Sequence, residues 1–154
     1  MYTRRAVLLT ALCAVVTPFA LAQEAKPDKN KPQSEVASKT AKFATVKPGD
    51  GSVTQALKAS DLAGAKKLVG KDGTFEGTVA ALFTPKGNGL VILNFDKNYR
   101  NALTAVVRSK SFAAFPDLKE LKGKRVLITG KFEDYQGRPE VVLTKPEQLK
   151  LIAE

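Results

Sequence analysis

Two kinds of side chain in this sequence are suited to holding a planar or anionic ligand, namely tyrosines and arginines in polar segments. A tyrosine ring can stack on a flat π-system, and the forked guanidinium of an arginine can donate two hydrogen bonds to a phosphate or carboxylate. Nearby lysines and amides would add charge and hydrogen bonds. The candidate ligand-binding residues are Lys86, Asn88, Lys97, Tyr99, Arg100, Arg108, Tyr135, Gln136 and Arg138.

Each of these residues also has a purely structural interpretation. Tyr135 would close the end of a β-barrel, and Tyr99 would cover its own loop. Arg138 would form an ion pair with Glu133 or Glu140, and such exposed pairs contribute little to stability. Both interpretations remain open from the sequence, and they differ in whether the side chains share one exposed face.

The composition offers few residues for catalysis or metal binding. The chain contains no histidine, and Cys13 is its only cysteine, so zinc, haem and nucleophile–base sites are not expected. We therefore predict no cofactor, no metal site and no catalytic residue.

An enzymatic alternative rests on carboxylates. Asp96, Glu133, Asp134 and Glu140 lie near expected loops and would be the ligands of a calcium-dependent, nuclease-like phosphodiesterase. However, Glu133 and Glu140 are expected to face each other across a hairpin as solvated charges, and Asp96 stands alone. A non-catalytic binding function is the preferred prediction.

The N-terminal segment has the features of an export signal. Arg4 and Arg5 precede an apolar run at residues 6–22 that ends in Ala20-Leu21-Ala22. This order predicts a signal peptide over residues 1–22 and an exported protein, periplasmic or secreted, that is not held in a membrane after cleavage. An uncleaved anchor is the alternative, because the run is marginal for spanning a bilayer. The general and twin-arginine routes both remain open.

The next segment, residues 23–59, has the composition of a linker. Its first part is polar and rich in lysine and proline, with Val36 as the only large apolar side chain before Phe43. Such a segment buries too little apolar surface to offset its ordering entropy, so we predict disorder.

Residues 60–154 are expected to form the folded domain. Ser60 begins a short helix that ends at Gly70. Alternating apolar residues then predict three strands, and two short helical segments precede a hairpin whose turn lies at residues 134–139. Four phenylalanines are expected in the core: Phe75, Phe83, Phe112 and Phe132. The expected strands cover residues 74–83, 90–95, 102–108 and the two arms of the hairpin between residues 123 and 149.

Five strands with a helical segment between the third and the fourth have the layout of an OB-fold, a Greek-key barrel. The predicted fold is therefore mainly β, a five-stranded OB-fold with one or two short helices. In this fold the face of the second and third strands binds ligands, together with the first–second and fourth–fifth loops. Lys86, Asn88 and the Tyr135–Arg138 turn would lie in those two loops.

The sequence also resembles exported bacterial OB-fold proteins of the nucleic-acid-binding type, with similarity to anticodon-binding domains and to relatives of staphylococcal nuclease. The resemblance covers residues 70–149 and implies an OB-fold that binds nucleic acid. It is carried by Gly70-Lys71, Glu76-Gly77-Thr78-Val79, Leu93-Asn94-Phe95-Asp96, Thr104-Ala105-Val106-Val107, Gly123–Gly130, Tyr135-Gln136-Gly137-Arg138-Pro139 and Pro146-Glu147-Gln148-Leu149.

The charge balance is compatible with an anionic ligand. The whole chain carries a formal charge of +10, and residues 60–154 contain sixteen lysines and arginines against eleven acidic residues. A moderately basic domain attracts polyanions without specifying one. We expect a binding module for single-stranded nucleic acid or another polyanion, such as an anionic envelope polymer. The alternative is an envelope-associated structural or protein-interaction module, and the oligomeric state is not predicted.

Overall fold

The computed structural model describes residues 30–154. The predicted signal peptide at residues 1–22 and the first part of the predicted linker lie outside the described residues. Within residues 30–154 no helix is both long enough and apolar enough to cross a membrane.

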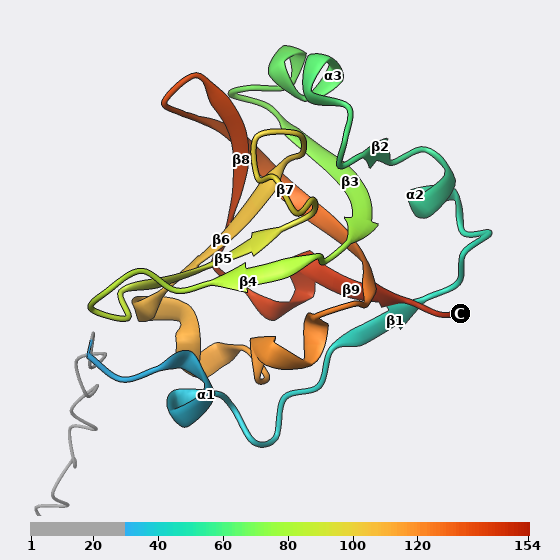
Figure 1. The fold of residues 1–154 in the computed structure, drawn as a ribbon. Helices are drawn as coiled ribbons and strands as arrows, with labels where there is room; N and C mark the ends of the chain where they lie inside the picture. The colour runs from blue at the N-terminus through green and yellow to red at the C-terminus, as the bar shows by residue number, and fades with distance from the viewer. Residues whose placement is uncertain (1–29) are drawn as a thin grey trace, which may run out of the picture.

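The described chain is mainly β, with several short helical segments (Figure 1). The strands are β1 (Ala44–Val46), β2 (Leu57–Lys58), β3 (Asp72–Thr78), β4 (Ala81–Phe83), β5 (Leu90–Asn94), β6 (Thr104–Arg108), β7 (Arg125–Tyr135), β8 (Arg138–Leu143) and β9 (Leu149–Ile152). The helical segments are α1 (Gln33–Val36), α2 (Gly51–Thr54), α3 (Leu62–Lys67) and the 3₁₀ turns η1 (Ser109–Ala114), η2 (Leu118–Leu121) and η3 (Pro146–Gln148). The predicted count of five strands is not confirmed, because residues 30–154 contain nine strand segments.

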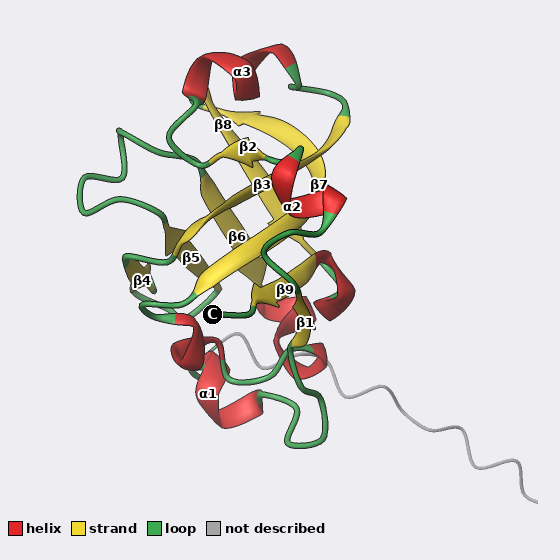
Figure 2. Ribbon diagram, turned by 90° about the vertical axis from the view of Figure 1, so that its right-hand side faces the viewer, coloured by secondary structure: helices red, strands yellow, loops and turns green. Residues whose placement is uncertain are grey.

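The strands form one strongly curled sheet. Its hydrogen-bonded order runs β4-β5-β6-β8-β7, and β7 pairs on with both β3 and β9. Since only Val79 and Ala80 separate β3 from β4, the sheet curls back towards its first strand. The pairs β3–β7, β4–β5, β5–β6 and β7–β8 are antiparallel, whereas β6 and β8 run parallel. Figure 2 shows α3 and α1 at opposite ends of this sheet.

The break between β3 and β4 changes which side chains point inwards. The Val79 amide donates to Lys124 O on the β7 side, and the Ala80 amide donates to Asn94 O of β5. Phe75 and Val79 are fully buried before the break, but after it Leu82 packs on the core and Phe83 points outwards with 54% of its surface exposed. The prediction that Phe83 is a core residue was wrong, because a change of partner strand shifts the alternation by one residue.

The interior of the curled sheet holds most of the large apolar side chains. Phe75 packs edge-to-face on Phe132, with 6.0 Å between the ring centroids, and on Phe95 at 5.1 Å. Phe112 and Phe115 close the end of the core next to η1 and are almost completely buried. The burial of Phe75, Phe112 and Phe132 agrees with the prediction that they are core residues.

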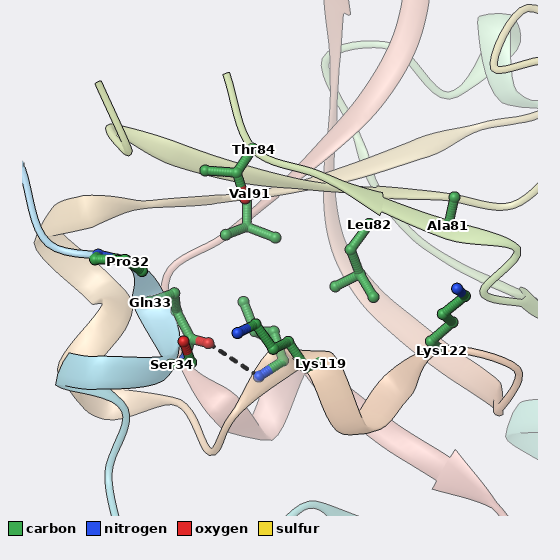
Figure 3. A pocket seen from close by; sticks show the side chains of 10 residues that line it. Pro32, Gln33, Ser34, Ala81, Leu82, Thr84, Val91, Lys119 and Lys122 are labelled. Carbon is green, nitrogen blue, oxygen red and sulfur yellow. Dashed lines mark hydrogen bonds between the residues drawn. The ribbon is translucent and has the colours of Figure 1, made fainter. Parts of the chain in front are cut away.

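Residues 30–59 differ from the predicted disordered linker where the structure describes them. They form α1, β1, α2 and β2, and β1 lies parallel to β9 at the edge of the sheet. Gln33 anchors the segment, because its side chain donates to Pro116 O at 2.8 Å and accepts from the Leu118 amide at 3.0 Å. The dashed line in Figure 3 marks the second of these bonds. Polar composition favoured disorder, whereas one buried amide and the strand pairing supply tertiary contacts that composition does not reveal.

One buried carboxylate is held by ion pairs on the β3 side of the sheet. Glu76 is 4% exposed, and its carboxylate accepts from Lys58 Nζ and, at 2.7 Å, from Arg125 Nε. The hydrogen bond from Arg125 is the main reason that the pKa of Glu76 lies below its ordinary value. This network joins β2, β3 and β7, and is structural.

Candidate functional site

A cavity of about 490 Å³ opens on the outer face of the curled sheet, where β4, β5, β6 and β8 lie side by side. Its rim carries the three most exposed large hydrophobic side chains of the described residues: Phe83 at 54%, Tyr135 at 52% and Tyr99 at 43%. Aromatic rings around an open cavity can stack on a planar ligand. The lining residues are Ala81, Leu82, Phe83, Ile92, Asn94, Tyr99, Thr104, Tyr135, Arg138 and Glu140.

The register of the strands places a polar row across the floor of this cavity. Asn94 of β5 is paired with Thr104 of β6, which is paired with Glu140 of β8. The next outward-facing row is apolar, because Ile92 is paired with Val106 and Val106 with Val142. A flat ligand lying across these strands would meet hydrogen-bonding groups on one edge and an apolar surface under its ring.

The loop between β5 and β6 positions Tyr99 through its own hydrogen bonds. Asp96 Oδ1 accepts from the Asn98 amide at 2.8 Å, and Asn98 Oδ1 accepts from the Arg100 amide at 3.2 Å. These Asx turns fix the chain on both sides of Tyr99. Asp96, a candidate metal ligand in the enzymatic alternative, therefore has a local structural role.

The hairpin turn positions Tyr135 and Arg138, which are paired across the end of β7 and β8. Gln136 and Gly137 between them both have positive φ, 54° and 79°, as a two-residue type I′ turn requires. Asp134 Oδ1 accepts from the Gly137 amide at 2.9 Å and stabilises the turn. The sequence predicted the turn at residues 134–139, but not the positive φ of Gln136.

Arg138 is stacked on Tyr99. Its guanidinium carbon lies 4.6 Å from the centroid of the Tyr99 ring, and that of Arg100 lies 5.6 Å from the same centroid. Arg138 Nη1 is buried and has no hydrogen-bond partner among the described residues. The face of the guanidinium thus packs on the Tyr99 ring, while Nη1 is left without an acceptor.

Glu140 lies on the cavity floor two residues after Arg138. It pairs in register with Glu133, as expected, but it is only 9% exposed, so the prediction that it is a solvated charge was wrong. Burial raises the pKa of the Glu140 carboxyl, with Glu133 acting in the same direction and with Arg108 and Arg138 opposing it. Among the described residues, the carboxylate has no hydrogen bond and no ion pair.

The structure brings together some of the predicted ligand-binding residues and separates others. Tyr99, Tyr135 and Arg138 line the cavity, and Arg100 lies against Tyr99. Arg108, at the end of β6, acts electrostatically on Glu140. Lys97 and Gln136 are exposed in the two loops that carry Tyr99 and Tyr135, and do not line the cavity.

Lys86 and Asn88 lie elsewhere. Their loop precedes β5, whereas the Tyr99 loop follows it, so the two loops sit at opposite ends of a strand that is roughly 17 Å long. The Asn88 side chain donates to Asn30 O at 2.9 Å and so contacts the N-terminal segment. Neither residue lines the aromatic cavity.

Sequence reasoning missed Phe83, Ile92, Asn94, Thr104 and Glu140 as cavity residues. The positions of Asn94 and Thr104 at the ends of neighbouring strands were a usable signal, because hairpin strands bring such positions together. Phe83 and Glu140 gave no such signal, since the outward direction of the first depends on the break at Val79–Ala80 and the burial of the second on its neighbours in the folded chain.

The carboxylates of the enzymatic alternative do not form one cluster. Within residues 30–154, no group of three or more histidine, cysteine, aspartate and glutamate side chains is placed to hold a metal ion. Glu133 and Glu140 are opposite each other on β7 and β8, and Asp134 and Asp96 are each engaged in a turn.

Comparisons with known proteins give limited similarity. No family model matches the sequence, and no curated protein matches it. The structure is similar to an aspartyl-tRNA synthetase from Entamoeba histolytica, with 17% identity, a TM-score of 0.49 and 75% of this chain covered. This chain spans about a quarter of that protein, with 26% covered. It is also similar to OBody AM1L10 bound to hen egg-white lysozyme, with 20% identity, a TM-score of 0.40, and 57% of this chain and 85% of that chain covered.

Proposed function

We propose that this chain is a non-catalytic binding module that takes single-stranded nucleic acid across the outer face of β4, β5, β6 and β8. The observation that carries the proposal is the aromatic cavity, in which Phe83, Tyr99 and Tyr135 surround a polar floor and Arg138 is stacked on Tyr99. Exposed rings stack on bases, and adjacent arginines bind the backbone phosphates. A polyanion without bases would contact only the arginine and lysine side chains, and would leave the aromatic rings unused.

The strand pairing supports an OB-type barrel. With β3 and β4 taken as one bent first strand, the sheet order is that of a five-stranded Greek key, and the parallel contact joins the third strand to the fifth. The turns η1 and η2 lie between the third and fourth strands. In this assignment the cavity lies on the second and third strands beside the fourth–fifth loop, a region where OB-folds bind oligonucleotides.

Binding of a fluorescein-labelled single-stranded oligonucleotide is measured by fluorescence anisotropy in about 50 mM salt. Each stacked base contributes roughly 1–3 kcal/mol, so Tyr99→Ala, Tyr135→Ala or Phe83→Ala should each weaken binding by about 5- to 150-fold. Tyr135→Phe should keep most of the affinity, because the ring remains.

Lys131→Ala is the surface control. Lys131 is exposed on β7 and does not line the cavity, and the substitution removes one positive charge. If the wild-type protein binds no oligonucleotide, or if the aromatic variants bind as well as Lys131→Ala does, the proposal fails. Retention on envelope fractions without oligonucleotide affinity would instead support the interaction-module alternative.

We also propose that the chain is exported, to the periplasm or beyond the cell. The support is the sequence pattern of residues 1–22 alone. N-terminal sequencing of the protein recovered from the periplasmic or extracellular fraction should begin at Gln23. Recovery of an uncleaved protein from the cytoplasm would contradict this.

A further inference from the structure

A half-buried arginine and a buried glutamate face the aromatic cavity without pairing to each other. Arg138 and Glu140 occupy alternate positions of β8 and both line the cavity. The ion pairs of the described residues are those of Glu76 with Lys58 and Arg125, and neither involves Arg138 or Glu140. Arg138 presents an unpartnered Nη1 donor, and Glu140 presents carboxylate oxygens without a hydrogen bond among the described residues.

An unpartnered buried atom such as Arg138 Nη1 is uncommon, because a buried donor or acceptor normally has a partner. Leaving that donor without an acceptor costs free energy, and so does keeping the Glu140 carboxylate in a largely buried position without a donor. Stability alone would favour a direct Arg138–Glu140 ion pair or two apolar residues. The separation of the two groups points to a ligand that bridges them.

Such a ligand must offer an acceptor to Arg138 and donors to Glu140, and it must be flat enough to lie among the three rings. A carboxylate is acceptor-only and has two oxygens, so two adjacent N–H donors satisfy it best. Guanine offers this pattern on one edge, with N1–H and the N2 amino group beside the O6 acceptor. Adenine and cytosine offer one amino group next to an acceptor nitrogen, and thymine and uracil offer one N–H between two carbonyls.

We propose that the cavity holds one unpaired guanine, with N1–H and N2–H₂ donating to Glu140 and with O6 accepting from Arg138. This inference rests on the nucleic-acid-binding function proposed above and adds its base specificity. The ring stacks against the aromatic rim, and Asn94 and Thr104 lie next to Glu140 in the same polar row to bond the remaining edge atoms. Guanine is thus read by a donor and an acceptor fixed two residues apart on one strand.

The test compares labelled 11-mers of deoxythymidine that differ only in the central base, read by fluorescence anisotropy. A single guanine in such a strand has no guanine neighbours to form a quadruplex with. The full-length mature protein should bind the guanine strand about tenfold more tightly than the all-thymine strand. It should also prefer guanine to hypoxanthine by several-fold, since hypoxanthine lacks only the N2 amino group.

Glu140→Gln should abolish the difference between guanine and hypoxanthine, because an amide has one acceptor oxygen and adds donors that face N1–H and N2–H₂. Glu133→Gln is the matched control: it makes the same chemical change on the paired strand at an exposed position, and it should keep the preference. Thermal unfolding of each variant, monitored by circular dichroism, checks that the variant is folded before it is heated.

The outcomes separate this inference from the function on which it rests. If all central bases bind equally well in the wild-type protein, or if adenine or cytosine binds more tightly than guanine, the guanine site is wrong and nucleic-acid binding stands. A preference that survives Glu140→Gln also overturns the site. If no strand binds at all, the proposed function fails together with the inference.

Discussion

At the scale of single residues, Glu76 and Glu140 are both buried carboxylates, and they differ in their partners. Glu76 receives hydrogen bonds from Arg125 and Lys58, whereas Glu140 has none among the described residues. The pKa of Glu76 is therefore lowered by its partners, chiefly Arg125, and the pKa of Glu140 is raised, chiefly by burial. The two carboxylates should accordingly affect stability in opposite directions as the pH changes.

Glu76→Gln should lower the free energy of unfolding at pH 7 by about 1–3 kcal/mol, because it removes the charge that Arg125 and Lys58 bond. A lowered folded-state pKa stabilises the protein above the ordinary value of 4.5, and that contribution is lost as the pH falls through the folded pKa. The deficit of the variant should thus shrink below pH 4.5. Urea unfolding at pH 7 and at pH 3 measures it, with the exposed Glu147→Gln as control. An equal deficit at both pH values would contradict the ion-pair explanation.

Glu140→Gln should raise the free energy of unfolding at pH 7 by roughly 1 kcal/mol, the size of a typical single-residue effect. A raised folded-state pKa means that stability is fully present below the ordinary value of 4.5 and declines as the pH rises through the folded pKa. The gain should therefore vanish at low pH. The same urea titrations measure it, and a variant less stable than the wild type at pH 7 would show that the carboxylate supports the fold.

At the scale of elements, the N-terminal segment is the clearest departure from what composition predicts. Its first part, α1, is attached through Gln33, which bonds Pro116 O and the Leu118 amide at the turn before η2. Figure 3 shows Gln33 beside a second cavity, of about 430 Å³, which Leu82 and Lys119 also line. The Ser38 amide adds one further bond, to Phe115 O at 2.9 Å. The attachment of α1 is therefore local and should depend largely on Gln33, whereas β1 is held separately by its pairing with β9.

Gln33→Ala should lower the free energy of unfolding by about 1–3 kcal/mol, because it leaves a buried carbonyl and a buried amide without partners. Gln55→Ala is the control, since Gln55 is exposed just after α2. Hydrogen exchange should additionally show faster exchange of the Leu118 amide in Gln33→Ala. If Gln33→Ala and Gln55→Ala lower the free energy of unfolding by the same small amount, α1 does not depend on the Gln33 side chain.

The elements also show what the sequence can and cannot predict. The hairpin turn and the inward direction of Phe75 and Phe132 follow from local rules, namely glycine in a tight turn and period-two alternation. The outward direction of Phe83 does not, because it depends on where the chain leaves β7 for β5. A glycine inside a predicted strand is a natural place to expect a bend, but Gly77 lies within β3, where a Cβ would meet the Ala59 Cβ at 2.8 Å.

The candidate site was predictable to a similar extent. Tyr99, Tyr135 and Arg138 were identified because loops at the end of a barrel carry exposed aromatic and cationic residues. The polar row and the burial of Glu140 required the register between β6 and β8, a parallel pair that is remote in sequence. Lys86 and Asn88 were grouped with the others by loop type, although their loop lies at the other end of β5.

At the scale of the whole molecule, stacking and charge should separate in their dependence on salt. The chain carries a formal charge of +10, Arg138 lines the cavity, Arg100 lies against Tyr99, and Lys97 is exposed in the same loop as Tyr99. Contacts to phosphates release counterions, and for single strands log affinity falls against log salt with a slope of about −0.7 per phosphate contacted. Stacking on Tyr99 and Tyr135 releases none.

The wild-type slope should therefore lie at about −1.5 to −3, which corresponds to two to four phosphates. Arg100→Ala should make it shallower by about 0.7, whereas Tyr135→Ala should lower affinity by a similar factor at every salt concentration and leave the slope unchanged. Anisotropy titrations of one labelled oligonucleotide between about 50 and 300 mM salt give both quantities. Lys131→Ala is again the control and should change the affinity and the slope only slightly. A slope that Tyr135→Ala alters as strongly as Arg100→Ala does would mean that the ring positions a phosphate contact rather than a base.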